Sequence, residues 1–235
     1  MLGCIGTYFN NCDFSSNGAS SGYTGDGWFR GVSMSQSSPN IRTGFSATMF
    51  NNNREDGIIV PALNDNITFV ACQAWNNNGV GAPGGHGFEI NSDDFSIMGC
   101  VSSGNNNGIS LNGGNGVVQA NVCKNNAGSF GTGIKAYNID SVQLINNICH
   151  DNAAAGIDVN ADTGQTCDDI TLAFNETYAN NIGMYLSNEV ISPTLAYNRN
   201  HNNTTADLQN NAITPIIPTT GAPDWSAITL SLIHI

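Results

Sequence analysis

Short runs in which apolar and polar residues alternate recur along most of the chain. Six of them begin with a glycine and continue apolar, any residue, apolar, at 57–60, 87–90, 108–111, 133–136, 156–159 and 183–186. Their starting points are 30, 21, 25, 23 and 27 residues apart. Alternation with a period of two is typical of a β-strand, and self-similarity at 20–50 residues is typical of a solenoid. The pattern predicts one such strand in every coil of a β-solenoid.

A second apolar run follows each glycine-led run, at 67–70, 95–98, 117–120, 142–145, 170–173 and 193–196. Just after it, one position forms an inward column: Cys12, Ala47, Cys72, Cys100, Asn121, Asn147, Asn175 and Asn198. Neighbouring strands lie ~4.8 Å apart, so we expect the Asn amides to hydrogen-bond from coil to coil as a ladder. A second inward column is predicted two residues later: Phe14, Met49, Ala74, Ser102, Cys123, Cys149, Thr177 and Asn200.

The composition supports a fold of strands and turns. The chain has 27 Gly and repeated Asn runs, which favour turns and disfavour helix interiors, so helices should be almost absent. Seven Cys form an odd set without a CxxC pair or zinc-type spacing. Because several of them fall in the inward columns, we expect packed thiols in preference to disulfides.

The columns, the glycine-led strands and the Asn ladder together resemble the pectate-lyase-like superfamily of right-handed parallel β-helices. The resemblance covers roughly residues 3–211 and implies an all-β, single-stranded right-handed parallel β-helix with three strands per coil and about eight coils. It also implies polysaccharide as the partner and an extracellular or virion-associated location. The same scaffold carries lyases, hydrolases, epimerases, tailspikes and adhesins, so the resemblance leaves the activity open.

The two ends of the chain depart from the repeat. Residues 1–211 are expected to be the β-helix, truncated at its N-terminus, and 212–229, which contain three Pro, a loop or linker. The last six residues, 230–235, match the translation of a common sequencing adapter; the alternative is a short apolar strand. The N-terminus lacks the basic and apolar regions of a signal peptide.

The net charge of −12 at pH 7 disfavours phosphate backbones and anionic lipid. No apolar run approaches the ~18 residues of a membrane span. Nucleic acid and membrane are therefore not expected as partners. An acidic glycan would need a cation or a local basic patch.

Alternation predicts which side chains of the glycine-led strands point outward. Enzymes of the resembled superfamily place catalytic groups on this face, which implies catalytic roles for Lys135, Tyr137 and Asp158. Neighbouring outward residues are expected to contact substrate: Glu89, Asn91, Asn112, Asn160 and Tyr185. Glu89 and Asp158 lie three coils, ~14 Å, apart, farther than the ~5–9.5 Å of a glycosidase carboxylate pair. A solvated Lys–Asp pair beside Tyr137 is the alternative without function.

His86 stands in Gly85-His86-Gly87, which resembles the Gly-His-Gly of polygalacturonases and the catalytic module of mannuronan C5-epimerases. Both resemblances are incomplete, because the acidic motifs expected in earlier coils are absent. His86 ends a long Gly-rich turn that could form the rim of a groove, and we expect it to act there as a general base; a solvated histidine is the alternative.

The third predicted strand carries an outward column of Phe50, Trp75, Ser103, Lys124, His150, Tyr178 and His201. Aromatic rings can stack on sugars, so we expect Trp75 to contact substrate; the equal alternative is a subunit interface in a homotrimer. Acidic residues beside the first strand, namely Asp93, Asp94, Asp140, Asp158 and Asp162, suggest calcium as the cofactor. No loop has the spacing of a calcium site, and no metal ligand set is predicted.

These features favour binding, with cleavage or modification, of an extracellular uronate-type polysaccharide. If the chain is an enzyme, it is expected to be a polysaccharide lyase or C5-epimerase. The alternative is a tailspike or adhesin fragment that recognises glycan as a trimeric shaft without turnover.

Overall fold

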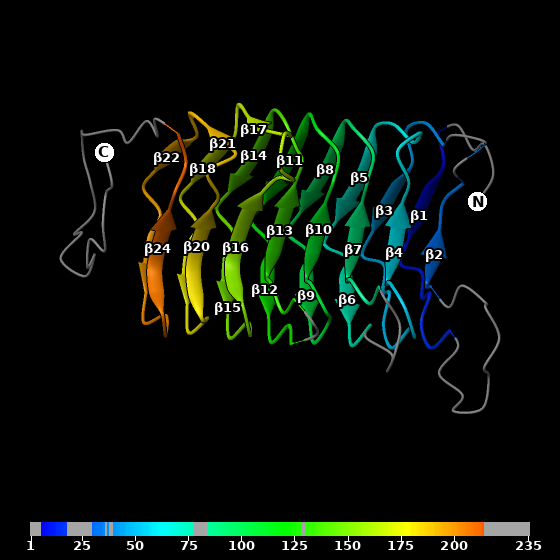
Figure 1. Cartoon of the computed structure of the whole chain (residues 1–235). Helices are drawn as coiled ribbons and strands as arrows, with labels where there is room; N and C mark the ends of the chain where they lie inside the picture. Colours follow the sequence, from blue (N-terminus) through cyan, green and yellow to red (C-terminus); the bar gives the residue numbers. More distant parts are fainter. Residues whose placement is uncertain are drawn as a thin grey trace.

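The computed structural model describes residues 6–17, 30–35, 37, 40–77, 84–127 and 130–213, and these form a parallel β-solenoid. The described residues contain strands and turns but no helix, so none of them forms a helix long and apolar enough to cross a membrane. Three sheets run along the solenoid, and every strand pair in them is parallel (Figure 1). The predicted parallel β-helix is confirmed.

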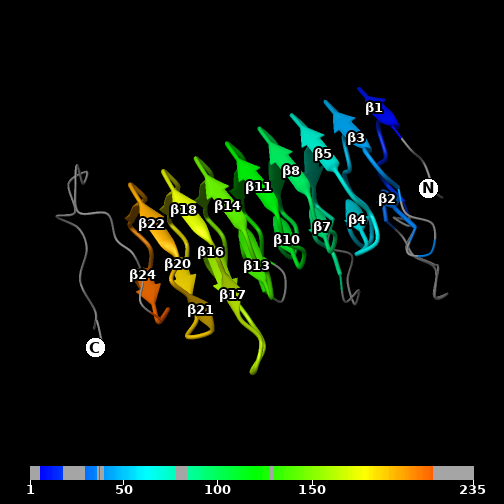
Figure 2. The ribbon, with the colours of Figure 1, turned by 90° about the horizontal axis from the view of Figure 1, so that it is seen from above.

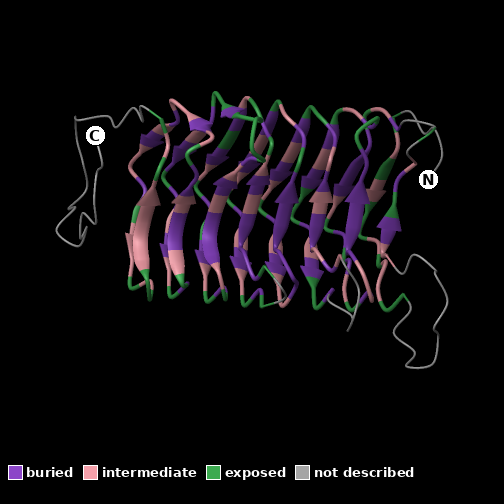
Figure 3. Cartoon of the chain, viewed as in Figure 1, coloured by how far each residue is buried: buried purple, intermediate pink, exposed green. Residues whose placement is uncertain are grey.

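The first sheet contains the glycine-led strands and is called the first-strand sheet. Its members are β2 (Val32–Ser33), β4 (Ile58–Val60), β7 (Phe88–Ile90), β10 (Ile109–Leu111), β13 (Ile134–Tyr137), β16 (Ala155–Asn160), β20 (Ile182–Leu186) and β24 (Ala206–Asn210). Figure 3 shows buried residues in its strands from β4 to β20.

The second-strand sheet also has eight strands, seen side by side from above in Figure 2. They are β1 (Tyr8–Asn10), β3 (Gly44–Ser46), β5 (Ile67–Val70), β8 (Phe95–Met98), β11 (Gly116–Gln119), β14 (Val142–Ile145), β18 (Thr171–Ala173) and β22 (Thr194–Ala196).

The third-strand sheet has six strands: β6 (Gln73–Trp75), β9 (Val101–Ser103), β12 (Val122–Lys124), β15 (Ile148–His150), β19 (Glu176–Tyr178) and β23 (Arg199–His201). A separate pair, β17 (Cys167–Asp168) and β21 (Val190–Ile191), widens two turns. About six coils therefore carry all three strands, slightly fewer than the eight predicted. The expected tail at 230–235 and most of the expected linker lie outside the described residues.

The recurring glycine is required by close approach of the backbones of neighbouring coils. A Cβ on Gly57, Gly87, Gly108 or Gly133 would lie 2.5–2.6 Å from the carbonyl oxygen of the corresponding glycine in the next coil. Because a side chain at this position would overlap the neighbouring coil, only glycine fits, and the glycine column fixes where each first strand begins.

The predicted Asn ladder is present between the second and third strands. Asn121 donates to Asn147, Asn147 to Asn175 and Asn175 to Asn198, each from Nδ2 to Oδ1 at 3.0 Å. All four side chains are buried, and each Nδ2 also donates to a backbone carbonyl of the preceding coil. The ladder satisfies amides that would be costly to bury unpaired.

The predicted position of the inward column was wrong by one residue in the coil that contains Ala47. Ala47 is exposed, with φ 46°, and Thr48 occupies the buried ladder position. Phe50, predicted to point outward, is fully buried, whereas Met49 is 37% exposed. The core decides this register, because the Phe50 ring stacks on Phe14 with centroids 5.9 Å apart.

A second Asn ladder, which the prediction missed, lies in the turn that precedes the first strand. Its members are Asn17, Asn53, Asn77, Asn105, Asn126, Asn152, Asn180 and Asn203. The residue before each ladder Asn from Asn53 onward has a positive φ, as at Asn52, Asn76 and Asn125. Asn tolerates this left-handed backbone, so the Asn pairs in the sequence each supply one turn residue and one ladder residue.

Candidate functional site

Two columns of side chains run along the outer face of the first-strand sheet. The pre-glycine column consists of the residues just before each glycine: Arg30, Asp56, His86, Asn107, Thr132, Ala155 and Ile182. The mid-strand column consists of the directly paired residues Ile59, Glu89, Ser110, Lys135, Asp158, Tyr185 and Gln209. Apart from Gln209, each of these residues was predicted from alternation to lie on the same face, and the register places them in one column, although Ile59 and Ser110 are buried in it. Polar and charged groups from distant parts of the sequence thus share one face.

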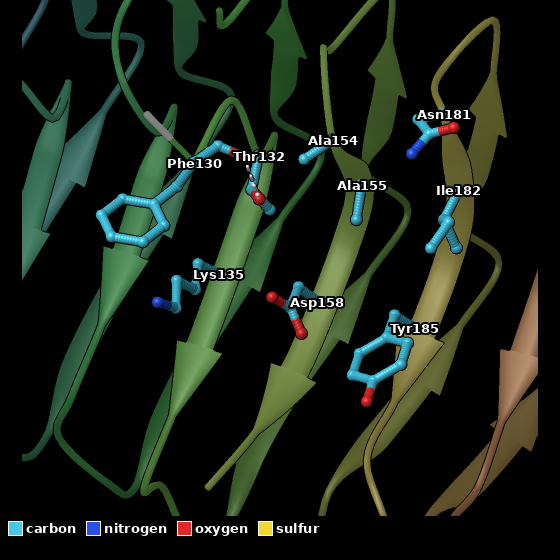
Figure 4. A pocket seen from close by; sticks show the side chains of 9 residues that line it. All are labelled: Phe130, Thr132, Lys135, Ala154, Ala155, Asp158, Asn181, Ile182 and Tyr185. Atoms are coloured by element: carbon cyan, nitrogen blue, oxygen red, sulfur yellow. Dashed lines mark hydrogen bonds between the residues drawn. The ribbon is translucent and has the colours of Figure 1, made fainter. Parts of the chain in front are cut away.

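A pocket of about 320 Å³ lies where the two columns cross β13, β16 and β20. It is lined by Phe130, Thr132, Lys135, Ala154, Ala155, Asp158, Asn181, Ile182 and Tyr185 (Figure 4). Lys135 and Asp158 supply its charges, and Phe130, Ile182 and Tyr185 supply apolar walls. The pocket therefore brings together two predicted catalytic residues and one predicted substrate-binding residue.

Lys135 and Asp158 are register partners, yet no ion pair joins them among the described residues. The Lys135 ammonium lies over the Phe130 ring, 4.7 Å from its centroid, and 4.8 Å from that of Tyr137. Burial raises the pKa of Asp158 to about 6, and the charge of Lys135 opposes this rise. Asp158 Oδ1 is buried and has no hydrogen-bond partner in the described part of the chain. The two groups are available to a ligand.

Tyr137 is engaged with the turn after β16 and does not line the pocket. Its hydroxyl donates to Asp162, which also accepts from Asn138 Nδ2 at 3.1 Å. This hydrogen bond raises the pKa of Tyr137 and lowers the pKa of Asp162. Tyr137 therefore orients Asp162 and offers one face of its ring to Lys135.

A second charged group gathers around Asp56, a residue that the sequence reasoning missed. Asp56 is fully buried and pairs with Arg30 at 2.8 Å, from Nε to Oδ2. Its Oδ1 accepts from the backbone N–H groups of Gly85 at 2.9 Å and His86 at 3.0 Å. Asp56 thereby fixes the end of the Gly-rich turn and the place of His86.

His86 and Glu89 complete this group, and together with Asp56 they offer ligand atoms within 4.8 Å of one another. Burial lowers the pKa of His86, although the charge of Asp56 opposes this. Burial, followed by the charge of Asp56, raises the pKa of Glu89 to about 7. The structure places predicted catalytic His86 and predicted substrate-binding Glu89 in one group, separate from the pocket at Lys135.

A signal for Asp56 was present in the sequence. Arg30, Asp56 and His86 each precede a glycine of the repeat, and aligning the coils on that glycine stacks all three. The prediction considered His86 by itself and did not align the residues that precede the other glycines. Phe130 was missed for a different reason, because the length of its turn does not reveal where its ring lies.

The predicted substrate-binding amides form part of the same face. Asn91 Nδ2 donates to Glu89 Oε1 at 3.0 Å, and Asn112 Nδ2 donates to Asn91 Oδ1 at 2.6 Å. Asn160 Oδ1 accepts from its neighbour, the backbone N–H of Ala161, at 2.8 Å. Asn91 and Asn112 thus extend a polar row from Glu89 across two coils, whereas Asn160 is used in its own turn.

On the third-strand sheet, Trp75 is 41% exposed, as its predicted outward position requires. His150, Tyr178 and His201 stack face to face, with centroids 4.7 and 5.4 Å apart. Because the rings cover each other's faces, this column offers mainly ring edges to a ligand. Trp75 is separated from the stack by Ser103 and Lys124.

The acidic residues expected to hold calcium are scattered, and two of them are engaged in turns. Asp93 accepts from the Gly114 N–H at 2.7 Å, and Asp140 accepts from the Asp168 N–H at 2.9 Å. Within the described ranges, Asp56, His86 and Glu89 are the group in which three metal-type ligands converge.

No protein-family model matches the sequence, and a sequence search of curated proteins finds no match. Solved structures do match. The Dettilon tailspike protein (gp208) has 17% identity and a TM-score of 0.56, over 71% of this chain and 39% of that chain. A mutant of the periplasmic alginate epimerase AlgG has 14% identity and a TM-score of 0.62, over 83% and 47%.

Pectate lyase Pel9A has 14% identity and a TM-score of 0.56, over 84% of this chain and 53% of that chain. This chain therefore spans between 39% and 53% of the length of these three proteins. At such identities the likeness concerns the fold alone. The chain is a parallel β-helix, similar in fold to these three proteins.

Proposed function

We propose that the outer face of the first-strand sheet binds a uronate-type polysaccharide and that the pocket at Lys135 and Asp158 cleaves or epimerises it. The observation that carries this proposal is the pocket itself, in which a cation and a half-buried carboxyl group stand between apolar walls. Perturbed ionisable groups in a concave site are typical of catalysis. The similar structures include an alginate epimerase and a pectate lyase by name, which supports the choice of substrate class.

Each group suits a step of uronate chemistry. Removal of the proton at C5 builds negative charge on the uronate carboxylate, and the Lys135 ammonium would stabilise it. A base with a pKa of about 6, as at Asp158, is largely ionised at neutral pH and close to the pKa range that favours proton transfer. Glu89, Ser110, Lys135, Asp158 and Tyr185 span four strand spacings, ~19 Å, which is room for several sugar residues.

The test is absorbance at 232 nm during incubation with alginate and pectate, and NMR of the products for epimerisation. We expect turnover by the wild type and at least a hundredfold loss in Lys135→Ala and Asp158→Asn. Lys124→Ala is the matched control, because Lys124 points outward from the third-strand sheet. Equal loss in the control would contradict the assignment of the site.

A glycan-binding shaft without turnover is the second candidate, and the tailspike likeness together with exposed Trp75 favours it. It predicts a trimer by light scattering and binding that Trp75→Ala weakens while Lys135→Ala does not. Glycan binding that Trp75→Ala weakens and Lys135→Ala does not, without any turnover, would favour this candidate over the enzyme. An extracellular or virion-associated location is proposed in either case.

A further inference from the structure

The group around Asp56 is chemically distinct from the pocket. Asp56 and His86 are successive members of the pre-glycine column, and Glu89 lies two residues after Gly87 in the mid-strand column. One oxygen of each carboxylate and one ring nitrogen of His86 lie within 4.8 Å of one another. Metal–ligand bonds of ~2.0–2.2 Å place the ligand atoms around one ion at most ~4.4 Å apart, so a shift of at most a few tenths of an ångström would bring these donors around a single ion.

The charges around these donors do not balance. Glu55, Asp56 and Glu89 contribute three carboxylates, and Arg30 contributes one guanidinium, 2.8 Å from Asp56 and 3.5 Å from Glu55. With the carboxylates ionised, the group carries a net charge of −2. Glu55 Oε2 is buried and has no hydrogen-bond partner in the part of the chain that the structure describes. A divalent cation would neutralise this group.

The donors are held in place before any ion binds. Three hydrogen bonds, from Arg30, Gly85 and His86, fix the Asp56 carboxylate and use three of its roughly four lone-pair sites. Asn91 fixes Glu89 through Oε1. His86 Nδ1 is buried and has no hydrogen-bond partner among the described residues, so the ring offers a nitrogen that the protein itself does not use.

We infer that Asp56, His86 and Glu89 form a binding site for a divalent transition-metal ion such as zinc or manganese. The imidazole nitrogen in the donor set favours zinc, and the two carboxylates also suit manganese, whereas calcium and magnesium take oxygen ligands. Three protein ligands leave at least one coordination position for water or a sugar oxygen. Glu89 belongs to the mid-strand column, so that position would face the same side of the sheet as Lys135. The inference does not rest on the proposed enzymatic activity.

Binding is tested by titrating EDTA-treated full-length chain with zinc, manganese and calcium chlorides in a calorimeter, without polysaccharide. We expect one zinc or manganese ion per chain, and at least a tenfold lower affinity in Glu89→Gln and in His86→Gln. Asp158→Asn is the matched control, since it removes a carboxylate from the same sheet but outside the group, and it should retain wild-type affinity. Cobalt absorption provides a second readout, whose visible bands should change in His86→Gln.

Absence of saturable zinc and manganese binding by the wild type would overturn the inference. Equal affinities in the wild type and Glu89→Gln, or binding of calcium alone, would overturn it as well. Circular dichroism establishes whether each variant is folded. If either Glu89→Gln or His86→Gln unfolds the chain, the metal affinity of the remaining folded variant tests the inference. Because no glycan is present, failure here leaves the turnover assay unaffected.

Discussion

Lys135 and Asp158 face each other across β13 and β16, but the lysine ammonium rests on the Phe130 ring instead of on the carboxylate. The consequence is a half-buried carboxyl group that lacks the ion pair its position offers. Burial raises the pKa of Asp158, and the charge of Lys135 offsets only part of this rise. Side chains that stabilise the fold usually find partners, so the arrangement is easier to explain as preparation for a ligand.

The first prediction concerns the pH dependence of stability at Asp158. The pKa of a free Asp is about 3.8, and in the fold it rises to about 6, so between these values the native chain binds more protons than the unfolded chain. The contribution of Asp158 to the free energy of unfolding is therefore most favourable below pH 4, and it is lost as the pH rises through 6. We expect Asp158→Asn to be more stable than the wild type by about 1–3 kcal/mol at pH 8.

The measurement is urea unfolding of both proteins at pH 4 and pH 8. The difference between them should be several times smaller at pH 4, where Asp158 is largely protonated in the native chain and partly protonated in the unfolded one. A constant difference at both pH values would mean that ionisation is not its cause.

The second prediction concerns the ladder. In Asn147→Ala, the backbone N–H and the side-chain amide of Asn121 both lose their acceptor, the Oδ1 atom of Asn147. Leaving buried groups unpaired should lower the free energy of unfolding by about 2–4 kcal/mol. Chemical denaturation measures this loss, and Gln143→Ala, at an exposed position on β14, is the control expected to stay within about 0.5 kcal/mol of the wild type.

The third prediction concerns the glycine column. A Cβ on Gly133 would lie 2.5 Å from the Gly156 oxygen, so Gly133→Ala should force the coils apart and cost about 3 kcal/mol or more. Gly99→Ala is the matched control. Nothing lies within 4 Å of its Cβ, and equivalent positions in other coils hold Ala71 and Ala120 with positive φ. Its cost should be about 1–2 kcal/mol; equal melting temperatures for the two variants would contradict the packing argument.

The fourth prediction concerns the stacked thiols. Cys123 and Cys149 are fully buried register partners, and the neighbouring thiol followed by burial raises the pKa of Cys123. A thiol kept protonated and out of contact with solvent is inert. Peptide mapping after treatment with Ellman's reagent should find both cysteines unmodified in native protein and modified in urea. Rapid labelling of the native chain at either position would show that this part of the core opens.

The sequence was most informative where the repeat is chemically strict. Glycine, Asn and alternating apolar residues recur because each coil must match its neighbour, so the strands, their register and one ladder were predictable. The prediction erred around Ala47, where packing of Phe50 against Phe14 decided the register and the polar pattern was weak.

The candidate site was less predictable. Outward positions of Glu89, Lys135 and Asp158 followed from alternation, but the partners of each side chain depend on rotamers and on turns of unequal length. Lys135 could not be placed over Phe130 from spacing, nor could Asp56 be recognised without aligning the residues before the glycines.

The ladder that runs through the pre-strand turns makes each coil an interchangeable unit. Asn105 and Asn126 are consecutive rungs, 21 residues apart, and the intervening coil places only Ser110 between Glu89 and Lys135 in the mid-strand column. That coil acts as a spacer. Removing residues 105–125 would join Gly104 to Asn126, keep the rungs in order, and bring the two charged centres closer by one strand spacing, ~4.8 Å. The number of whole coils between the two charged centres therefore sets the distance that separates them.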